Sequence, residues 1–264
     1  YPPGRHEVVQ NLKLCLRLMD GHTPTGGDPA PYQAEGEGEI KDEWTSGLAL
    51  EFHPSATDAI HATALLGELL HNAAPVVAIH PGAGAAVKMW PAERWAALAD
   101  ALVRRWNAAI VLTGSAAERP LTQAIAQHMR RAALDLSGQT SLGELAAVFD
   151  LCGLVMGVDS GPLHLAVAMG TPTVHLFGPV SPVAFGPWGD PARHVVVQAS
   201  YADEPCHGRP CNRLDFAGQE LAEHRCVASI TLEDALAAAE GLLSRRAVRP
   251  PERFQEGAEA HPGT

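Results

Sequence analysis

The sequence lacks any run of 18 or more apolar residues, so it predicts no helix that spans a membrane. Its first residues, YPPGRHEVV, contain neither the basic nor the apolar segment that begins a secretory signal. The five cysteines are an odd number spread over 264 residues, unlike the disulfide framework of a small secreted protein. These absences indicate a globular cytoplasmic protein with reduced thiols. Because the chain starts at Tyr1 and not at Met, we also expect a fragment or a truncated product.

Positive charge is scarce as well. The chain has 19 Lys and Arg residues against 30 Asp and Glu residues, which gives a formal net charge of -11. No Lys/Arg cluster is longer than the pair Arg245 and Arg246. Domains that bind nucleic acid usually present a basic stripe, which displaces counterions from the phosphate backbone. The composition therefore argues against a nucleic-acid partner.

Three common motifs are missing. No Gly-Lys-Ser/Thr sequence completes a Walker loop, and no Gly-x-Gly-x-x-Gly opens a strand-helix unit, which disfavours an NAD-dependent oxidoreductase. The Gly-x-Ser-x-Gly elbow of serine hydrolases is missing too.

What is present is a regular alternation of short apolar runs with segments of helical periodicity. The predicted strands are 76–80, 109–113, 134–137, 154–158 and 173–177, with a possible edge strand at 194–198. The predicted helices after Pro75 are 91–106, 118–131, 141–149, 163–169 and 231–246. This alternation predicts an α/β fold with a doubly wound, parallel, Rossmann-like sheet.

The segments before Pro75 follow a different pattern. Residues 6–19 have helical spacing with one apolar face, and residues 23–47 are typical of a surface linker. Residues 48–52 fit a short strand. A helix is expected over residues 58–70, with Ile60, Ala64 and Leu65 facing inward.

The loop HPGAGAAVKMWP, residues 80–91, follows the first predicted strand of the sheet. Gly82 and Gly84 allow a tight turn that exposes backbone N–H groups, and the helix near Pro91 adds positive potential at its N-terminus. Lys88 supplies a point charge for a diphosphate. The same pattern also fits an ordinary strand-to-helix loop with a solvated lysine.

The segment VLTGSAAER, residues 111–119, places Gly114 after a strand and Glu118 at the entrance of a helix. A carboxylate at this place accepts hydrogen bonds from a ribose diol in nucleotide-binding folds. Glu118 could equally do no more than stabilise the helix N-terminus, an effect of about 0.3 to 1 kcal/mol.

The segment VDSGPLHLAVAMGTP, residues 158–172, is the most specific. It brings a carboxylate (Asp159), a hydroxyl (Ser160), a bare amide (Gly161) and an imidazole (His164) to the start of one helix. Helix N–H groups, the hydroxyl and the imidazole are suited to an anion. A capped helix with His164 packed on an apolar face is the alternative. A hydrolase triad is disfavoured, because three members within six residues rarely reach one another correctly.

A cysteine-rich segment lies near the C-terminal end of the sheet region. Cys206, Cys211 and Cys226, with His207 and His224, could supply four soft ligands to zinc. The Cys-x4-Cys spacing is loose and has no clean second pair, so simple loop thiols are the alternative.

In this order, the blocks resemble glycosyltransferase family 9, the heptosyltransferases of the lipopolysaccharide inner core. The ordered combination is more specific than any single block, and it extends from Pro75 to the last helix. The cysteine-bearing segment also resembles a loop of that family. The matching residues are His80, Pro81, Gly82, Ala83, Lys88, Trp90, Pro91, Thr113, Gly114, Glu118, 137–142, Asp159, Ser160, Gly161, Pro162, His164, Phe177, Gly178 and Pro179.

The resemblance implies the C-terminal, nucleotide-sugar-binding half of a GT-B enzyme. It divides the chain into residues 1–74, the last helix of an N-terminal domain with the interdomain linker, a Rossmann-like domain over 75–246, and a disordered tail over 247–264. Most of the N-terminal domain, with the general base, is then missing, and the chain alone is expected to bind the donor but transfer poorly. A catalytically inactive nucleotide-binding module is the alternative.

The resemblance also implies a site. The donor is a nucleotide sugar such as ADP-heptose, the acceptor is the lipopolysaccharide core, and transfer is inverting and independent of metal. Lys88 and His164 stabilise the leaving group, and peripheral association of the full enzyme with the inner face of the inner membrane is expected. The implied donor-binding residues are Gly82, Ala83, Lys88, Gly114, Glu118, Asp159, Ser160, Gly161 and His164.

Overall fold

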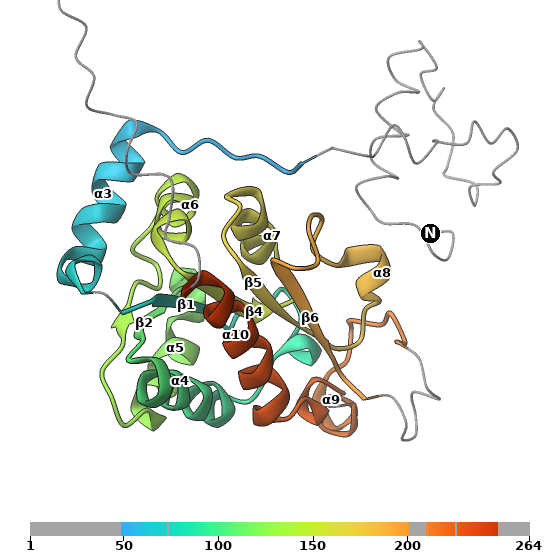
Figure 1. Ribbon diagram of the computed structural model, residues 1–264. Helices are drawn as coiled ribbons and strands as arrows, with labels where there is room; N and C mark the ends of the chain where they lie inside the picture. The colour runs from blue at the N-terminus through green and yellow to red at the C-terminus, as the bar shows by residue number, and fades with distance from the viewer. Residues whose placement is uncertain (1–48, 73, 201–209, 225, 248–264) are drawn as a thin grey trace, which may run out of the picture.

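Six parallel strands form a single sheet in the order β3-β2-β1-β4-β5-β6 (Figure 1). The computed structural model describes residues 49–72, 74–200, 210–224 and 226–247. This is the Rossmann order, which reverses direction between β1 and β4. The predicted α/β, doubly wound parallel fold is confirmed. The strands are β1 (Val76–His80), β2 (Ala109–Leu112), β3 (Leu134–Asp135), β4 (Leu154–Val158), β5 (Thr173–Phe177) and β6 (His194–Gln198).

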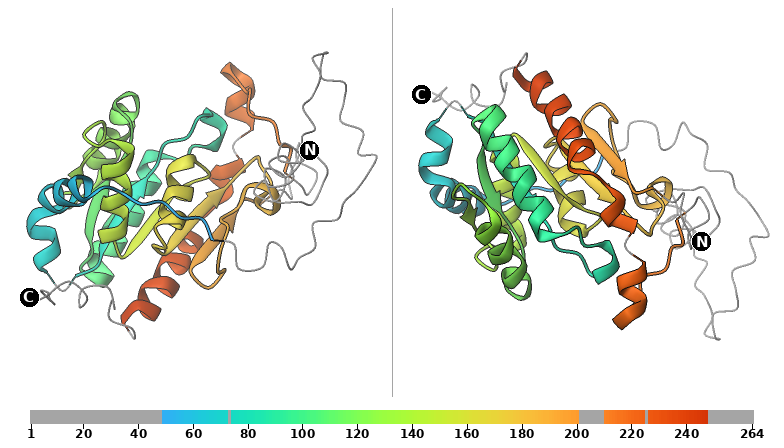
Figure 2. Two further views of the ribbon diagram at one scale, coloured as in Figure 1. Left: turned by 90° about the horizontal axis from the view of Figure 1, so that it is seen from above. Right: turned by 90° about the horizontal axis from the view of Figure 1, so that it is seen from below.

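Helices cover both faces of the sheet, as the views from above and below show (Figure 2). One layer contains α3 (Ala56–Leu66), α6 (Leu142–Leu151) and α7 (Gly161–Ala168). The other contains α4 (Ala92–Trp106), α5 (Arg119–His128) and α10 (Leu232–Ala247). The short elements are η1 (Gly67–His71), η2 (Ala86–Lys88), η3 (Ala116–Glu118), α8 (Pro182–Phe185), α9 (Gly218–Glu223) and η4 (Cys226–Ser229).

Every residue of β1, β4 and β5 is buried. Such strands are continuous apolar runs because helices exclude water from both faces of the sheet. Successive side chains of β1 enter different cores: Val77 packs in the cluster that contains Trp95 of α4, and Ala78 packs in the cluster that contains Phe149 of α6. The helical periodicity predicted over residues 91–106 is confirmed, since α4 buries Trp95, Leu98, Ala99 and Leu102.

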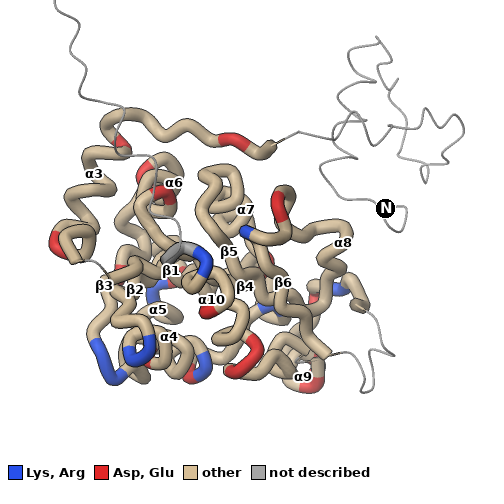
Figure 3. The backbone as a smooth tube through the Cα atoms, in the orientation of Figure 1, with Lys and Arg blue, Asp and Glu red and all other residues tan. Residues whose placement is uncertain are grey.

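The last helix, α10, is fixed to the layer of α4. Glu240 of α10 accepts hydrogen bonds from the Arg105 guanidinium at 3.1 Å and from the Trp106 indole at 3.3 Å. Figure 3 shows that basic residues gather at the ends of α4 and α5, whereas acidic residues are spread over both layers.

Of two expectations for the segment before β1, one is wrong and the other is correct only in part. Residues 49–54 form neither a strand nor a helix, because this described stretch pairs with no strand of the sheet; residue 48 lies outside the described residues. In α3, Ala62 and Leu66 are buried, and the predicted Leu65 is partly buried against the same core. The predicted Ile60 is 67% exposed, and Ala64 is exposed too. The helix is apolar on several sides, so its periodicity did not identify the face that contacts α6.

The predicted helix over residues 6–19, the linker over 23–47 and residues 248–264 of the predicted tail lie outside the described residues. Helix α3 precedes the predicted domain boundary at residue 75 and packs against α6. Among the described residues, no helix has the length and apolar content needed to cross a lipid bilayer.

Candidate functional site: a cavity at the strand-order reversal

A cavity of about 440 Å³ opens at the carboxyl ends of β1 and β4, where the strand order reverses. In open α/β sheets this is the usual place for a ligand. A larger hollow of about 870 Å³ lies at the other edge of the sheet, and none of the predicted site residues lines it. The predicted residues that line the first cavity are Gly82, Ala83, Lys88, Gly114, Glu118, Asp159, Ser160 and Gly161.

An ion pair joins the loop after β1 to the end of β4. The Lys88 Nζ atom donates to the Asp159 carboxylate at 2.6 Å and to the Asp159 carbonyl oxygen at 3.3 Å. The two side chains are only 16% and 8% exposed. An ammonium group has three N–H donors, so one remains for an anion in the cavity.

The Glu118 carboxylate is held in place by its own helix entrance. Its Oε2 atom accepts hydrogen bonds from the Ser115 backbone N–H at 2.7 Å and from the Ser115 hydroxyl at 2.8 Å. Burial acts to raise the pKa of Glu118, but the hydrogen bonds from Ser115 and the neighbouring His80 outweigh it and lower the pKa. The carboxylate is therefore ionised near neutral pH.

The absence of side chains at Gly82 and Gly114 makes room for this carboxylate. A Cβ atom at Gly82 would lie 1.8 Å from Glu118 Oε1, and one at Gly114 would lie 3.3 Å from Glu118 Cβ. The glycines thus allow a charged group to lie directly against the backbone of two loops.

His80, the last residue of β1, is buried and lines the same cavity. Its Nδ1 atom lies 3.1 Å from the Thr113 hydroxyl. Burial lowers the pKa of His80 to about 4, although the charge of Glu118 opposes this shift. The imidazole is consequently neutral at pH 7.

Ser160 caps α7 by backbone geometry alone. It occupies the N-cap position with extended dihedral angles, but its side chain makes no capping hydrogen bond. Its Oγ atom is buried and has no hydrogen-bond partner among the described residues. Gly161 is exposed, and a Cβ atom there would meet nothing within 4 Å. The helix N-terminus is therefore open to the cavity, with one unused hydroxyl beside it.

His164 is not brought to the cavity with the other predicted residues. It lies in the first turn of α7, and its ring centroid is 5.8 Å from that of His175 on β5. Its assigned role in leaving-group stabilisation stays a prediction.

Several motif residues position loops instead of lining the site. The indole N–H of buried Trp90 donates to the Ile230 carbonyl at 3.1 Å, and Arg94 donates to the same oxygen at 2.7 Å. Gly178 leaves room for Val227 of η4, since a Cβ atom there would lie 2.1 Å from Val227 Cγ2. These contacts fix the segment 226–230 against the sheet.

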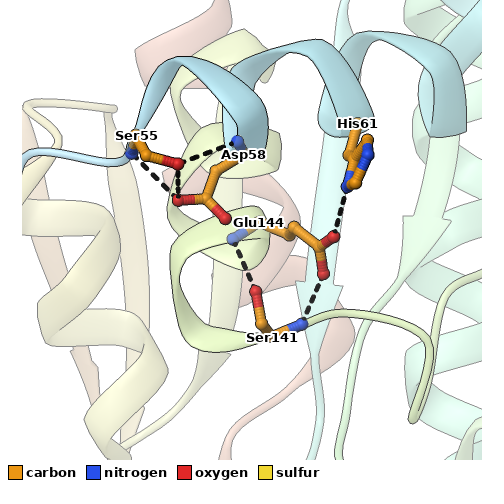
Figure 4. A network of polar contacts seen from close by, with 5 residues as sticks. All are labelled: Ser55, Asp58, His61, Ser141 and Glu144. Atoms are coloured by element: carbon orange, nitrogen blue, oxygen red, sulfur yellow. Dashed lines mark hydrogen bonds and ion pairs between the residues drawn. The ribbon is translucent and has the colours of Figure 1, made fainter.

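The segment 140–142 borders the cavity and is fixed by two linked capping boxes (Figure 4). Ser141 and Glu144 cap α6 reciprocally at the start of the helix predicted over 141–149. Ser55 and Asp58 do the same for α3. His61 of α3 joins that helix to the capping box of α6, because its Nδ1 atom lies 2.8 Å from Glu144 Oε1.

The candidate zinc ligands are not assembled in the described part of the chain, where no group of three or more His, Cys, Asp and Glu side chains is suited to a metal. The His224 ring stacks on Phe216 at 4.3 Å, and its Nδ1 atom contacts the Glu220 carbonyl at 2.8 Å. Cys211 is exposed. Cys206 lies outside the described residues.

Sequence reasoning missed two site residues. Ser115 was not recognised as a capping residue, although the Ser-x-x-Glu spacing of 115–118 is a capping-box signal. His80 was noted only as part of a motif. No signal in the sequence could reveal its contact with Thr113, because His80 ends β1 and Thr113 follows the neighbouring strand β2.

A family model described as glycosyltransferase family 9 (heptosyltransferase) matches residues 33–215. Lipooligosaccharide heptosyltransferase 2 of Haemophilus influenzae is 36% identical over 135 residues, which are 49% of this chain and 37% of that protein. Lipopolysaccharide heptosyltransferase 1 of Pseudomonas aeruginosa is 31% identical over 163 residues, which are 62% of this chain and 43% of that protein. The chain thus spans less than half the length of these two relatives.

Two solved structures share the fold. The glycosyl transferase family 9 protein from Veillonella parvula has a TM-score of 0.66 and 23% identity, and the match covers 91% of this chain and 60% of that one. The E. coli ADP-heptose LPS heptosyltransferase II has a TM-score of 0.58 and 23% identity, and covers 75% of this chain and 54% of that one. With the family model matching most of its length, the chain belongs to glycosyltransferase family 9.

Proposed function

We propose that this chain is the donor-binding part of a glycosyltransferase that transfers a heptose, or a related sugar, from a nucleotide-diphosphate donor to a lipopolysaccharide core acceptor. The observation that carries this proposal is the cavity at the strand-order reversal, which holds Lys88, Glu118 and the start of α7 together. The E. coli protein of similar fold is named for ADP-heptose, and we take this donor as the first candidate.

The cavity has one part suited to phosphate. Lys88 retains a free N–H, Ser160 has an unused hydroxyl, and the N-terminus of α7 carries partial positive charge. In the proposed reaction an acceptor hydroxyl oxygen bonds to the anomeric carbon while the bond from that carbon to the diphosphate oxygen breaks. The hydroxyl proton passes to a general base of the N-terminal domain, and negative charge grows on the departing diphosphate. These groups would stabilise that charge where it develops. We assign Asp159 to holding the Lys88 ammonium in this position.

The other part of the cavity is suited to the nucleoside. Glu118, anchored by Ser115, presents an ionised carboxylate beside Gly82. A ribose diol is a natural partner for such a carboxylate. We place the acceptor at the open rim of the cavity and the reaction at the cytoplasmic face of the inner membrane.

Isothermal titration calorimetry of the chain with ADP, UDP and NAD tests the proposal. We expect ADP to bind and NAD not to bind. Lys88→Ala should weaken ADP binding at least about tenfold, the value of one lost charged hydrogen bond. Arg104→Ala is the matched control, since Arg104 is an exposed cation at the far end of α4 and should leave the affinity unchanged. If none of the three nucleotides binds, the proposal is wrong.

A further inference from the structure

We propose that His80 presents its Nε2 atom to the cavity as a hydrogen-bond acceptor and that His80 and Glu118 each accept a hydrogen bond from one hydroxyl of the donor's ribose. The inference rests on the proposed function, because it assigns a ribose-binding residue to the same site. It adds a neutral acceptor beside the charged one.

The hydrogen bonds of Thr113 determine which His80 nitrogen carries the proton. The Thr113 hydroxyl has one proton and lies 3.4 Å from the Ile79 carbonyl, to which it donates. In the proposed arrangement it accepts a hydrogen bond from His80, whose Nδ1 atom lies at 3.1 Å. In a neutral imidazole with Nδ1 protonated, Nε2 carries the lone pair.

The remaining acceptor of Glu118 lies in the same cavity. Its Oε2 atom takes both Ser115 donors, and Oε1 rests against Gly82 with no hydrogen-bond donor among the described residues. The Nε2 atom of His80 has no donor from this part of the chain either. The protein thus lines one cavity with two acceptors and leaves both for a ligand.

Two acceptors without donors repel each other, so they favour a ligand that brings two O–H groups. A vicinal diol has this chemistry and a phosphate group does not. His80 also keeps its lone pair at neutral pH, because burial lowers the pKa of the imidazole to about 4. The phosphate is directed toward Lys88, which lines the same cavity.

Two substitutions of His80 distinguish the loss of the Nε2 acceptor from the loss of the imidazole ring as a whole. His80→Asn keeps a polar group near the position of Nδ1, within reach of Thr113, but has nothing at the position of Nε2. His80→Gln places an amide near the position of Nε2 and so retains the acceptor. Binding of ADP, 2′-deoxy-ADP and 3′-deoxy-ADP to each variant is measured by calorimetry, with thermal unfolding as the control for folding.

For the unsubstituted chain we expect each deoxy nucleotide to bind about tenfold more weakly than ADP. In His80→Asn, one of the two deoxy nucleotides should bind within about twofold of ADP, because the acceptor for the missing hydroxyl is gone. The other deoxy nucleotide, which lacks the hydroxyl bound by Glu118, should still bind about tenfold more weakly than ADP. His80→Gln should retain both penalties. The inference is overturned if both deoxy nucleotides still bind about tenfold more weakly than ADP in His80→Asn. It is also overturned if His80→Asn and His80→Gln change these affinity ratios equally.

The inference can fail separately from the proposed function. If ADP binds but the penalties do not change, only the role of His80 is wrong. If UDP binds in place of ADP, the same comparison is made with the deoxy forms of UDP, because the ribose is common to both. If both variants unfold, 15N NMR of the histidines in the unsubstituted chain decides: a protonated Nε2 on His80 at pH 7 overturns the inference.

Discussion

The Lys88 ammonium group lies 2.6 Å from the Asp159 carboxylate and joins the loop after β1 to the end of β4 at the point where the strand order reverses. Both side chains are largely buried, so each charge is stabilised by its partner and little by water. Removing one partner of a buried pair leaves an uncompensated charge, which costs more than the pair itself contributes.

We therefore predict that Lys88→Ala lowers the free energy of unfolding by about 3 kcal/mol. Adding Asp159→Asn to that variant should restore most of the loss, because the unpaired carboxylate is then gone. Urea denaturation of the two single variants and the double variant measures this coupling. Simple addition of the two single effects would show that the pair is not coupled.

Gly82 and Gly84 lie in one loop and line one cavity, yet they differ in what surrounds them. A methyl group at Gly82 would displace Glu118 Oε1 and, with it, the two hydrogen bonds from Ser115, whereas one at Gly84 meets nothing within 4 Å. We predict that Gly82→Ala weakens ADP binding about tenfold, as expected for the loss of a charged hydrogen bond. Gly84→Ala is the matched control and should change the affinity less than about threefold. Equal effects of the two variants in calorimetry would contradict this account of Gly82.

The sequence was sufficient to predict the strands of the sheet. VVAIH, LVMGV and TVHLF are apolar throughout and lie next to Gly or Pro, so their bounds were correct to the residue. The same reasoning placed Lys88 and Asp159 at one edge of the sheet, since the carboxyl ends of parallel strands meet there.

Contacts between distant segments could not be predicted in this way. The buried face of α3 is selected by its fit to α6, and the helix has apolar residues on several sides. The sequence therefore could not show that Ala62 is buried and Ile60 is exposed. The tautomer of His80 depends on Thr113, which follows the neighbouring strand β2. The position of His164 against His175 depends likewise on how α7 rotates over β5.

The network in Figure 4 contains both a helix-capping hydrogen bond and an exposed pair of side chains, whose contributions to stability can be compared. Ser141→Ala removes the hydroxyl that accepts from the Glu144 backbone N–H at 3.2 Å and should cost about 1 kcal/mol of stability. His61→Ala removes a contact of a side chain that is 57% exposed and should cost less than about 0.5 kcal/mol. Urea denaturation of both variants tests the order, and a larger effect at His61 would show that the bridge between α3 and α6 matters more than the cap.

The buried histidines predict that the protein loses stability in mild acid. Burial lowers the pKa of His80 and of His194 to about 4, whereas both titrate near 6.5 in the unfolded chain. As pH falls from about 6.5 to about 4, the unfolded state takes up protons that the folded state cannot, so the free energy of unfolding decreases. For His80 alone the loss at pH 5 is about 2 kcal/mol. Urea denaturation at several pH values should show this slope, and His194→Asn should reduce it, while His53→Asn, at an exposed position, should not. A free energy of unfolding that is the same at pH 7 and pH 5 would mean that these imidazoles are protonated in the folded protein.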